Sequence, residues 1–199
     1  MSRLAGAAFA LIATTSLAHA EMPATTVAPP DMSDQAVGAA IGVAGGGRTT
    51  PGGLRISGHY LYQMSDADWF DGTAQFTFGS GAPACFRDRM DDTICQHGLV
   101  DGASAEVGAN VRHFLGGQGE FWPYVRLGVG IALVRYGDDE VTGVAIPFHG
   151  GGGFRVTVAD GIAVIAEAGI DIGFGRFGSG LGLEPQLGAS VMGGVEFRL

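Results

Sequence analysis

Apolar and polar residues alternate along most of this chain. In the last thirteen residues, mostly polar or small side chains separate a set of apolar or small ones, namely Leu187, Ala189, Val191, Gly193, Val195, Phe197 and Leu199. A repeat of two residues is typical of a β-strand with one apolar face. The same pattern predicts eight strands, at about 36–44, 54–64, 70–78, 103–114, 121–136, 144–158, 162–174 and 187–199.

The connections between the predicted strands differ in length. The third (79–102) and the seventh (175–185) are long, whereas the second, fourth and sixth are compact, and Asp160-Gly161 in the sixth is a hairpin signal. Pro147 has no N–H for a sheet, so we expect a β-bulge there. Short turns at one end and longer loops at the other are typical of outer-membrane barrels with an even number of strands.

The N-terminal residues differ from the rest of the chain. Arg3 supplies a positive start, an apolar stretch runs to residue 17, and Ala18-His19-Ala20 fits the small-x-small rule for cleavage. We therefore predict a cleaved secretory signal peptide over 1–20, since the stretch is short for a transmembrane helix. Residues 21–34 contain three prolines and no clear repeat. They are expected to form a flexible leader to a single β-barrel domain at 35–199.

Composition narrows the functional classes. The chain has no lysine, a formal net charge of −9 and 36 glycines among 199 residues. The missing basic stripe disfavours nucleic-acid binding, and so many glycines oppose long helices. Cys85 and Cys95 are the only cysteines. In an exported protein an even count predicts one disulfide closing a short loop, and their spacing does not fit a zinc site.

Alternation alone does not decide whether the apolar faces point into a soluble core or out into lipid. Three features favour a transmembrane barrel. The first is the alternation of short and long connections, and the second is the clustering of aromatic residues near the second and fourth connections and the chain end. The third is the composition of the strand face opposite the apolar one. The aromatic cluster, expected as a girdle at one rim, is Trp69, Phe70, Phe114, Phe121, Trp122, Tyr124 and Phe197. The opposite face consists of small residues and charges of both signs, as expected of a narrow lumen in which they pair. The predicted lumen charge network is Arg55, Glu106, Arg112, Arg126, Arg155, Glu167 and Asp171, with Glu196 and Arg198 as a further pair.

The chain resembles the small outer-membrane β-barrel proteins of Gram-negative bacteria, which include the outer membrane protein A transmembrane domain and the opacity-type proteins. The resemblance rests on the signal peptide, the eight alternating segments and the ending Val191-x-Gly193-x-Val195-x-Phe197-x-Leu199. Many family members end in Phe, whereas Phe197 stands two residues before the end here. The resemblance implies a multi-pass protein of the cell outer membrane, surrounded by outer-membrane lipids and lipopolysaccharide. It also implies that the barrel-assembly machinery reads Val191, Val195, Phe197 and Leu199.

Little in the sequence points to chemistry. His59 and His149 fall on the polar faces and His113 on an apolar one, and no Ser–His arrangement matches a known hydrolase, so we predict no enzyme, no cofactor and no metal site. The acidic loop positions are expected to be solvated, with divalent-cation binding as the alternative; they are Asp88, Asp91, Asp92, Asp138, Asp139 and Glu140. We therefore expect a structural or surface-interaction barrel whose extracellular partner the residues do not specify. The alternatives are a lipid A-modifying outer-membrane enzyme and a soluble periplasmic β-barrel that binds a lipid or another ligand.

Overall fold

The structure is a computed structural model that describes residues 35–82, 84–87, 93–96 and 98–199. The predicted signal peptide and leader lie outside these residues, as do Asp88, Asp91 and Asp92. Within the described ranges, no helix is long and apolar enough to cross a membrane.

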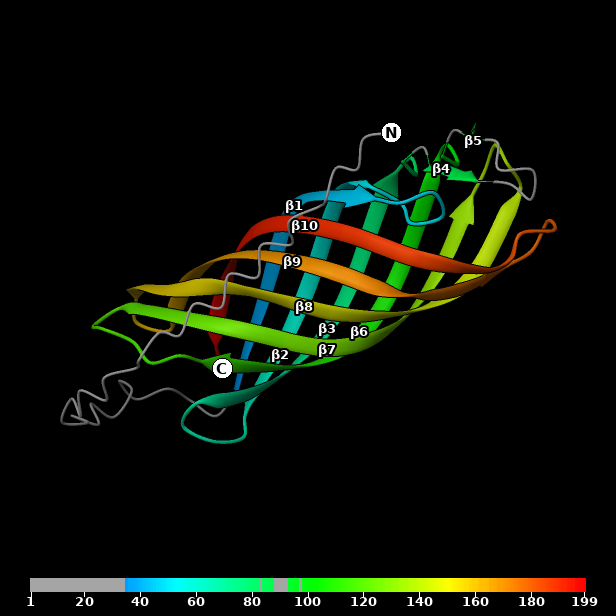
Figure 1. Ribbon diagram of the computed structural model, residues 1–199. Coiled ribbons are helices and arrows are strands. Elements are labelled where there is room, and N and C mark those ends of the chain that lie inside the picture. Colours follow the sequence, from blue (N-terminus) through cyan, green and yellow to red (C-terminus); the bar gives the residue numbers. More distant parts are fainter. Residues whose placement is uncertain (1–34, 83, 88–92, 97) are drawn as a thin grey trace, which may run out of the picture.

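Eight antiparallel strands close into a barrel (Figure 1). They are β1 (Gln35–Gly46), β2 (Gly53–Gln63), β3 (Asp68–Gly79), β6 (Gly102–Phe114), β7 (Phe121–Tyr136), β8 (Val141–Ala159), β9 (Ile162–Phe177) and β10 (Gly182–Arg198). Around the barrel the order is β1-β10-β9-β8-β7-β6-β3-β2, and β1 pairs with both β10 and β2, so that no edge strand is left. A separate hairpin of β4 (Ala84–Arg87) and β5 (Thr93–Gln96) lies between β3 and β6 in sequence. The predicted all-β, eight-stranded antiparallel barrel is confirmed.

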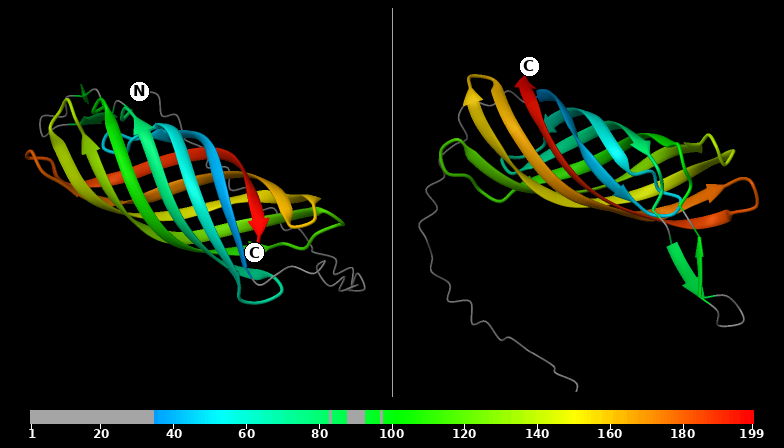
Figure 2. Two further views of the ribbon diagram at one scale, coloured as in Figure 1. Left: turned by 180° about the vertical axis from the view of Figure 1, so that it is seen from behind. Right: turned by 90° about the horizontal axis from the view of Figure 1, so that it is seen from above.

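The two ends of the barrel differ. One end, here called the terminal end, holds Gln35 and Leu199, whose backbones are joined by an N–H···O bond of 3.1 Å, together with the turns at 64–67, 115–120 and 160–161. The opposite end, here called the loop end, holds the connections at 47–52, 80–101, 137–140 and 178–181, including the β4–β5 hairpin that projects from the barrel in Figure 2.

Two sequence-based expectations about the last strands are wrong. The seventh connection is short, 178–181, because β9 continues to Phe177 and pairs with a β10 that already begins at Gly182. Gly175 faces inward here, where an added Cβ would lie 2.5 Å from a ring atom of Phe177, so this stretch lacks the clear alternation of large side chains that marks the other strands. Pro147 causes no bulge: the β7–β8 pairing lapses beside it and resumes in the same register, and the bulge lies at Thr157/Ala159 instead.

The strands point their apolar faces outward and their polar faces inward. Leu127 on β7 is 68% exposed, whereas its neighbour Arg126 is buried, and the same alternation runs through all eight strands. Because of this alternation, the residues of the predicted aromatic girdle point in two directions. Phe121 and Phe197 are exposed on the outer surface, whereas an inner set is buried inside the terminal end, namely Trp69, Phe114 and Tyr124. The rings do lie at the terminal end, as expected of a rim, but the inner set faces the lumen and is not part of an outer girdle.

Candidate functional site in the barrel interior

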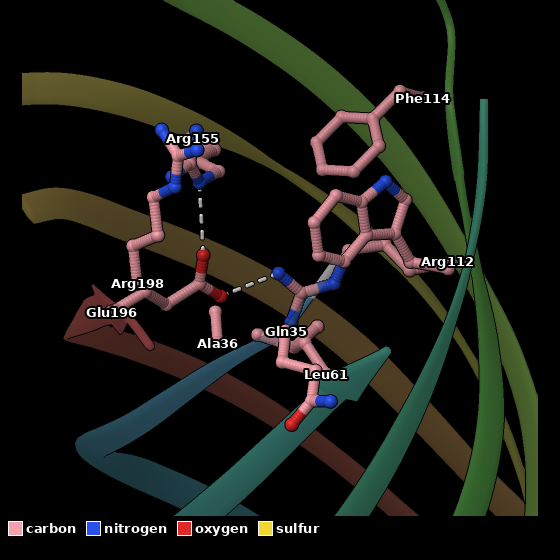
Figure 3. A pocket seen from close by; sticks show the side chains of 9 residues that line it. Gln35, Ala36, Leu61, Arg112, Phe114, Arg155, Glu196 and Arg198 are labelled. Carbon is pink, nitrogen blue, oxygen red and sulfur yellow. Dashed lines mark hydrogen bonds and ion pairs between the residues drawn. The ribbon is translucent and has the colours of Figure 1, made fainter. Parts of the chain in front are cut away.

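Charged side chains cross the interior near the terminal end. Arg112 on β6 is 0% exposed; its Nη1 lies 2.5 Å from Glu196 Oε1 on β10, and its Nη2 lies 3.0 Å from Asp71 Oδ2 on β3. β6 and β10 are four strands apart in either direction around the ring, so Arg112 and Glu196 tie opposite walls of the barrel together. Arg155 Nε donates to the second oxygen of Glu196 at 3.1 Å, as the dashed lines in Figure 3 show.

A second set of contacts surrounds Arg126 on β7. Its Nη2 lies 2.7 Å from Glu167 Oε1 on β9, and its Nη1 lies 3.7 Å from Asp71 Oδ2. The Tyr124 hydroxyl donates to Glu167 at 3.1 Å, while the Arg112 guanidinium lies 4.4 Å from the centroid of the Tyr124 ring. A cation over an aromatic face adds electrostatic attraction to the ion pairs. Arg112 and Arg126 are cross-strand partners of like charge, and the carboxylate of Asp71 is shared between them.

A third group lies closer to the loop end. Arg55 Nη1 on β2 contacts Asp171 Oδ2 on β9 at 2.8 Å, and Asp171 Oδ1 lies 2.8 Å from His149 Nδ1. The other nitrogen of His149 lies 2.8 Å from Glu106 Oε1, which also accepts from Gln75 Nε2 at 3.1 Å. The contacts therefore run from β2 across the barrel to β9 and β8, and from there to β6 and β3.

The structure places all seven residues of the sequence-predicted lumen network inside the barrel. Six of them have a partner of opposite charge, and Glu106 contacts the His149 ring and Gln75. Four arginines (Arg55, Arg112, Arg126 and Arg155) face five carboxylates (Asp71, Glu106, Glu167, Asp171 and Glu196). Sequence reasoning left Asp71 out of the network, although its position on the same face as Thr73 and Gln75 was a signal for it. Arg198, expected to pair inside the lumen with Glu196, is exposed at the terminal end.

The energetic role of this network follows from burial. Moving a charge out of water costs several kcal/mol, and ion pairing offsets this only when the geometry is good. Here each buried guanidinium has at least one carboxylate within about 3 Å. Removing one partner would weaken the compensation of a buried charge, so the network favours a single arrangement of the eight strands.

Apolar and aromatic side chains close the interior at both ends. At the terminal end, Phe114 packs edge-to-face against Trp69 (6.4 Å between centroids) and Tyr124 (5.6 Å). The cavity beside them, which Arg112 and Arg155 also line, holds about 20 Å³, enough for one water molecule (Figure 3). At the loop end, an apolar cluster fills the barrel, made of Ala132, Val134, Tyr136, Val141, Ala145 and Phe177. The charged middle is therefore enclosed.

Ser57, His59 and Asp71 form an array that sequence reasoning missed. Ser57 Oγ lies 2.8 Å from His59 Nε2, and His59 Nδ1 lies 3.0 Å from Asp71 Oδ1, as in a serine–histidine–aspartate triad. Acyl transfer also needs free donors for an oxyanion and room for a substrate. Ser57 is buried on a fully paired strand and does not line the terminal-end cavity, and Asp71 is bound by Arg112. This arrangement fits a structural hydrogen-bond chain.

Metal-binding geometry is absent from the part of the chain that the structure describes, where no three His, Cys, Asp or Glu side chains gather around one point. In the 137–140 loop, the nearby carboxylate of Asp101 raises the pKa of Asp138 above its ordinary value. Acidic groups are therefore crowded at this part of the loop end.

The two cysteines lie on the projecting hairpin. Cys85 on β4 and Cys95 on β5 are directly opposite in the antiparallel register. Directly opposed residues have Cα atoms about 4.5–5.5 Å apart, which a disulfide spans. The bond itself stays a prediction from the sequence.

The four residues expected to form the assembly signal share the outer face of β10 and its end. Val191, Val195, Phe197 and Leu199 are all exposed. Val191, Val195 and Phe197 stand opposite Val43, Ala39 and Val37 of β1, so the strand also closes the barrel.

These observations define the molecule as a closed eight-stranded barrel with an apolar exterior and a charged, filled interior. No family model matches the sequence, and no curated protein matches it. Among solved structures, Neisserial surface protein A (NspA) matches with a TM-score of 0.62 and 15% identity, over 85% of this chain and 100% of NspA. Ail, the attachment invasion locus protein of Yersinia pestis, matches at a TM-score of only 0.41 and 15% identity, over 83% and 96% of the two chains. The NspA match confirms the predicted resemblance to small surface barrels at the level of the fold.

Proposed function

We propose that this protein is a multi-pass β-barrel of the Gram-negative cell outer membrane, with a structural or surface-interaction role. The observation that carries the proposal is the orientation of the faces: large apolar side chains cover the outside and charged ones fill the inside. A soluble periplasmic barrel that bound a ligand would place its apolar faces inward. A transmembrane barrel places them in lipid, because lipid does not penalise their exposure.

The apolar band has the height that a membrane requires. On β7 the outward positions stay apolar from Phe121 to Leu133. Twelve steps along a strand tilted by about 40° rise roughly 30 Å, close to the thickness of a hydrocarbon core. Beyond this band, toward the loop end, the outward positions become charged and the inward ones aromatic. Arg135 and Arg176 point outward, while Tyr136 and Phe177 are buried inside. We place the membrane boundary there, with the loop end outside the cell.

Because the interior is filled, we expect any partner to bind at the surface of the barrel. Charged layers and apolar ends occupy the lumen, and eight strands leave no space for a wide pore. The surfaces available for partners are therefore the outer wall, which contacts outer-membrane lipids and lipopolysaccharide, and the loop end, which carries the projecting hairpin.

Three predictions from the sequence belong to this proposal. The signal peptide (1–20) would be removed during export, so that mass spectrometry of the mature protein finds Glu21 first. A disulfide between Cys85 and Cys95 would stabilise the hairpin by roughly 3 kcal/mol, and alkylation without reductant would leave both cysteines unmodified. Phe197→Ala together with Leu199→Ala would lower insertion in cells while leaving refolding from urea into detergent intact, as expected of a signal for the assembly machinery.

Fractionation tests the central proposal. Expressed in a Gram-negative host, the protein is expected in the outer membrane, released only by detergent, and to change gel mobility on boiling. Release by an osmotic wash would overturn the proposal. In planar bilayers the purified barrel is expected to show no stable conductance, and large steady currents would contradict the filled lumen.

The alternative of a lipid A-modifying enzyme has one supporting feature, the Ser57–His59–Asp71 array. We favour no enzymatic role, because the array is enclosed by the charged and aromatic layers. Mass spectrometry of lipid A from cells with wild-type protein and with Ser57→Ala separates the two, since a catalytic serine predicts a product that the variant does not make.

A further inference from the structure

The outer wall of the barrel carries a groove near the loop end. It has a volume of about 350 Å³ and is lined by residues of β3, β6, β7 and the start of β8. These four strands are neighbours in the barrel (Figure 1). Its floor is Ala103 and Ala105 on β6, flanked in register by Phe78 and Phe76 on β3. Leu133 and Arg135 on β7 form the other wall. Two alanines between rows of larger side chains leave a trough about as wide as the spacing of two strands, roughly 10 Å.

The basic residues at this end of the wall differ from those of the lumen. Every lumen arginine has a carboxylate partner, but Arg135 and Arg176 are exposed and have no hydrogen bond or ion pair within the residues that the structure describes. They lie two strands apart on the outward face: Arg135 is opposite Thr142 on β8, and Arg176 is opposite Val144, the next outward residue of the same strand. The groove and the two guanidinium groups thus share one edge of the apolar band.

The apolar groove and the two guanidinium groups at this edge favour a ligand with both an alkyl chain and phosphate groups. Apolar walls accept an alkyl chain, and a guanidinium at the upper end of the trough matches the geometry of a phosphate oxygen pair. If the loop end faces outward, as the proposed function requires, the lipid that meets this edge is the phosphorylated, multiply acylated glycolipid of the outer leaflet, lipid A. Its several phosphates and chains suit two separated cations beside an apolar wall.

We propose that the outer wall holds one lipid A molecule, with an acyl chain in the groove over Ala103 and Ala105 and phosphate groups at Arg135 and Arg176. This inference rests on the proposed outer-membrane location. Thr142 stands opposite Arg135 on β8, and its hydroxyl would be a further donor for the phosphate.

The test uses native mass spectrometry of the mature barrel in detergent, titrated with purified lipid A. We expect one bound molecule per barrel. Arg135→Gln removes the charge at the groove and is expected to weaken binding about ten-fold or more, with a smaller loss for Arg176→Gln, because charge-assisted hydrogen bonds are worth about 1.5–3 kcal/mol. Ala105→Phe fills the trough and is expected to abolish the binding of lipid A. Arg198→Gln, which changes an exposed arginine at the terminal end, is the matched control and leaves affinity unchanged.

The probes separate the possible outcomes. Lipid A stripped of its phosphates should bind at least ten-fold more weakly; equal binding would overturn the role of the arginines. Phosphatidylglycerol that binds as tightly as lipid A would overturn the choice of lipid. Unchanged affinity in both Arg135→Gln and Ala105→Phe would overturn the site. Each variant is first shown to keep its heat-modifiable mobility. A barrel that fractionates to the outer membrane but binds no lipid A contradicts this inference alone, whereas recovery in the periplasmic wash contradicts the proposed function.

Discussion

The tie between Arg112 and Glu196 gives the sharpest prediction about stability. Arg112→Met keeps the apolar stem and removes the guanidinium that joins opposite walls of the barrel. Breaking a buried ion pair by removing one partner typically costs 3–5 kcal/mol. Glu196 keeps Arg155 at 3.1 Å and Asp71 keeps His59 at 3.0 Å, so neither carboxylate is left alone. We therefore expect the lower end, about 3 kcal/mol, or roughly a hundred-fold change in the folded-to-unfolded ratio.

Urea unfolding in lipid vesicles, followed by tryptophan fluorescence, measures this change. Trp69 is the cross-strand partner of Arg112 and reports on the same region. The midpoint should fall without a change in slope, as expected when only stability changes. Arg135→Met is the control, since that side chain is exposed and has no ion pair among the residues that the structure describes; its effect should stay within about 0.5 kcal/mol.

A double-mutant cycle with Glu196→Gln then isolates the pair, with an expected coupling of about 1–3 kcal/mol. If Arg112→Met unfolded at the wild-type urea concentration, the idea that the lumen network holds the strands in one arrangement would be refuted.

Other changes test the wall, the ends and the loop. Gly42→Ala puts a Cβ 2.0 Å from the backbone oxygen of Val191 and should reduce the yield of heat-modifiable barrel, whereas Gly58→Ala meets no atom within 4 Å and should fold normally. Trp69→Ala should lower the unfolding free energy by about 3–5 kcal/mol, measured in urea, without creating conductance, because the charged layers remain. Asp138→Asn should raise the melting temperature at pH 7. Asp101 raises the pKa of Asp138, so its charged form destabilises the folded loop above that pKa. The gain should shrink as the pH falls through that pKa and vanish well below pH 3.8, where Asp138 is protonated in both the folded and the unfolded state.

Much of the fold could be predicted from the sequence because alternation is a local property. Strand β7 was predicted with its bounds, and the pattern of Val125, Leu127 and Val129 also indicates which face is apolar. The extent of β10 could not be predicted, because Glu184 and Pro185 do not alternate clearly; their pairing with Gly175 and Phe174 depends on backbone bonds from a distant strand. Pro147 likewise stays in register because its neighbours on both sides hold the strand.

The candidate site was predictable as a set of charges but not as an arrangement. That Arg55 and Glu167 face inward follows from their parity on the strands. That Asp71 is shared by Arg112 and Arg126 depends on which strands lie across the lumen, which local sequence does not encode. The Ser57–His59–Asp71 array was missed for the same reason, since Asp71 reaches His59 only through the register of β2 against β3.

The sequence by itself determined the period of two, the number of strands in the barrel and the separation of polar from apolar positions, because each depends on neighbours along the chain. Only the tertiary structure decided that the apolar side is the outside, that opposite walls meet at Arg112 and Glu196, and that a groove over Ala103 and Ala105 ends at Arg135, which has no ion pair with another described residue. The physical reason is closure. A closed sheet gives each face a single side, inner or outer, and its register sets which distant side chains share the narrow interior.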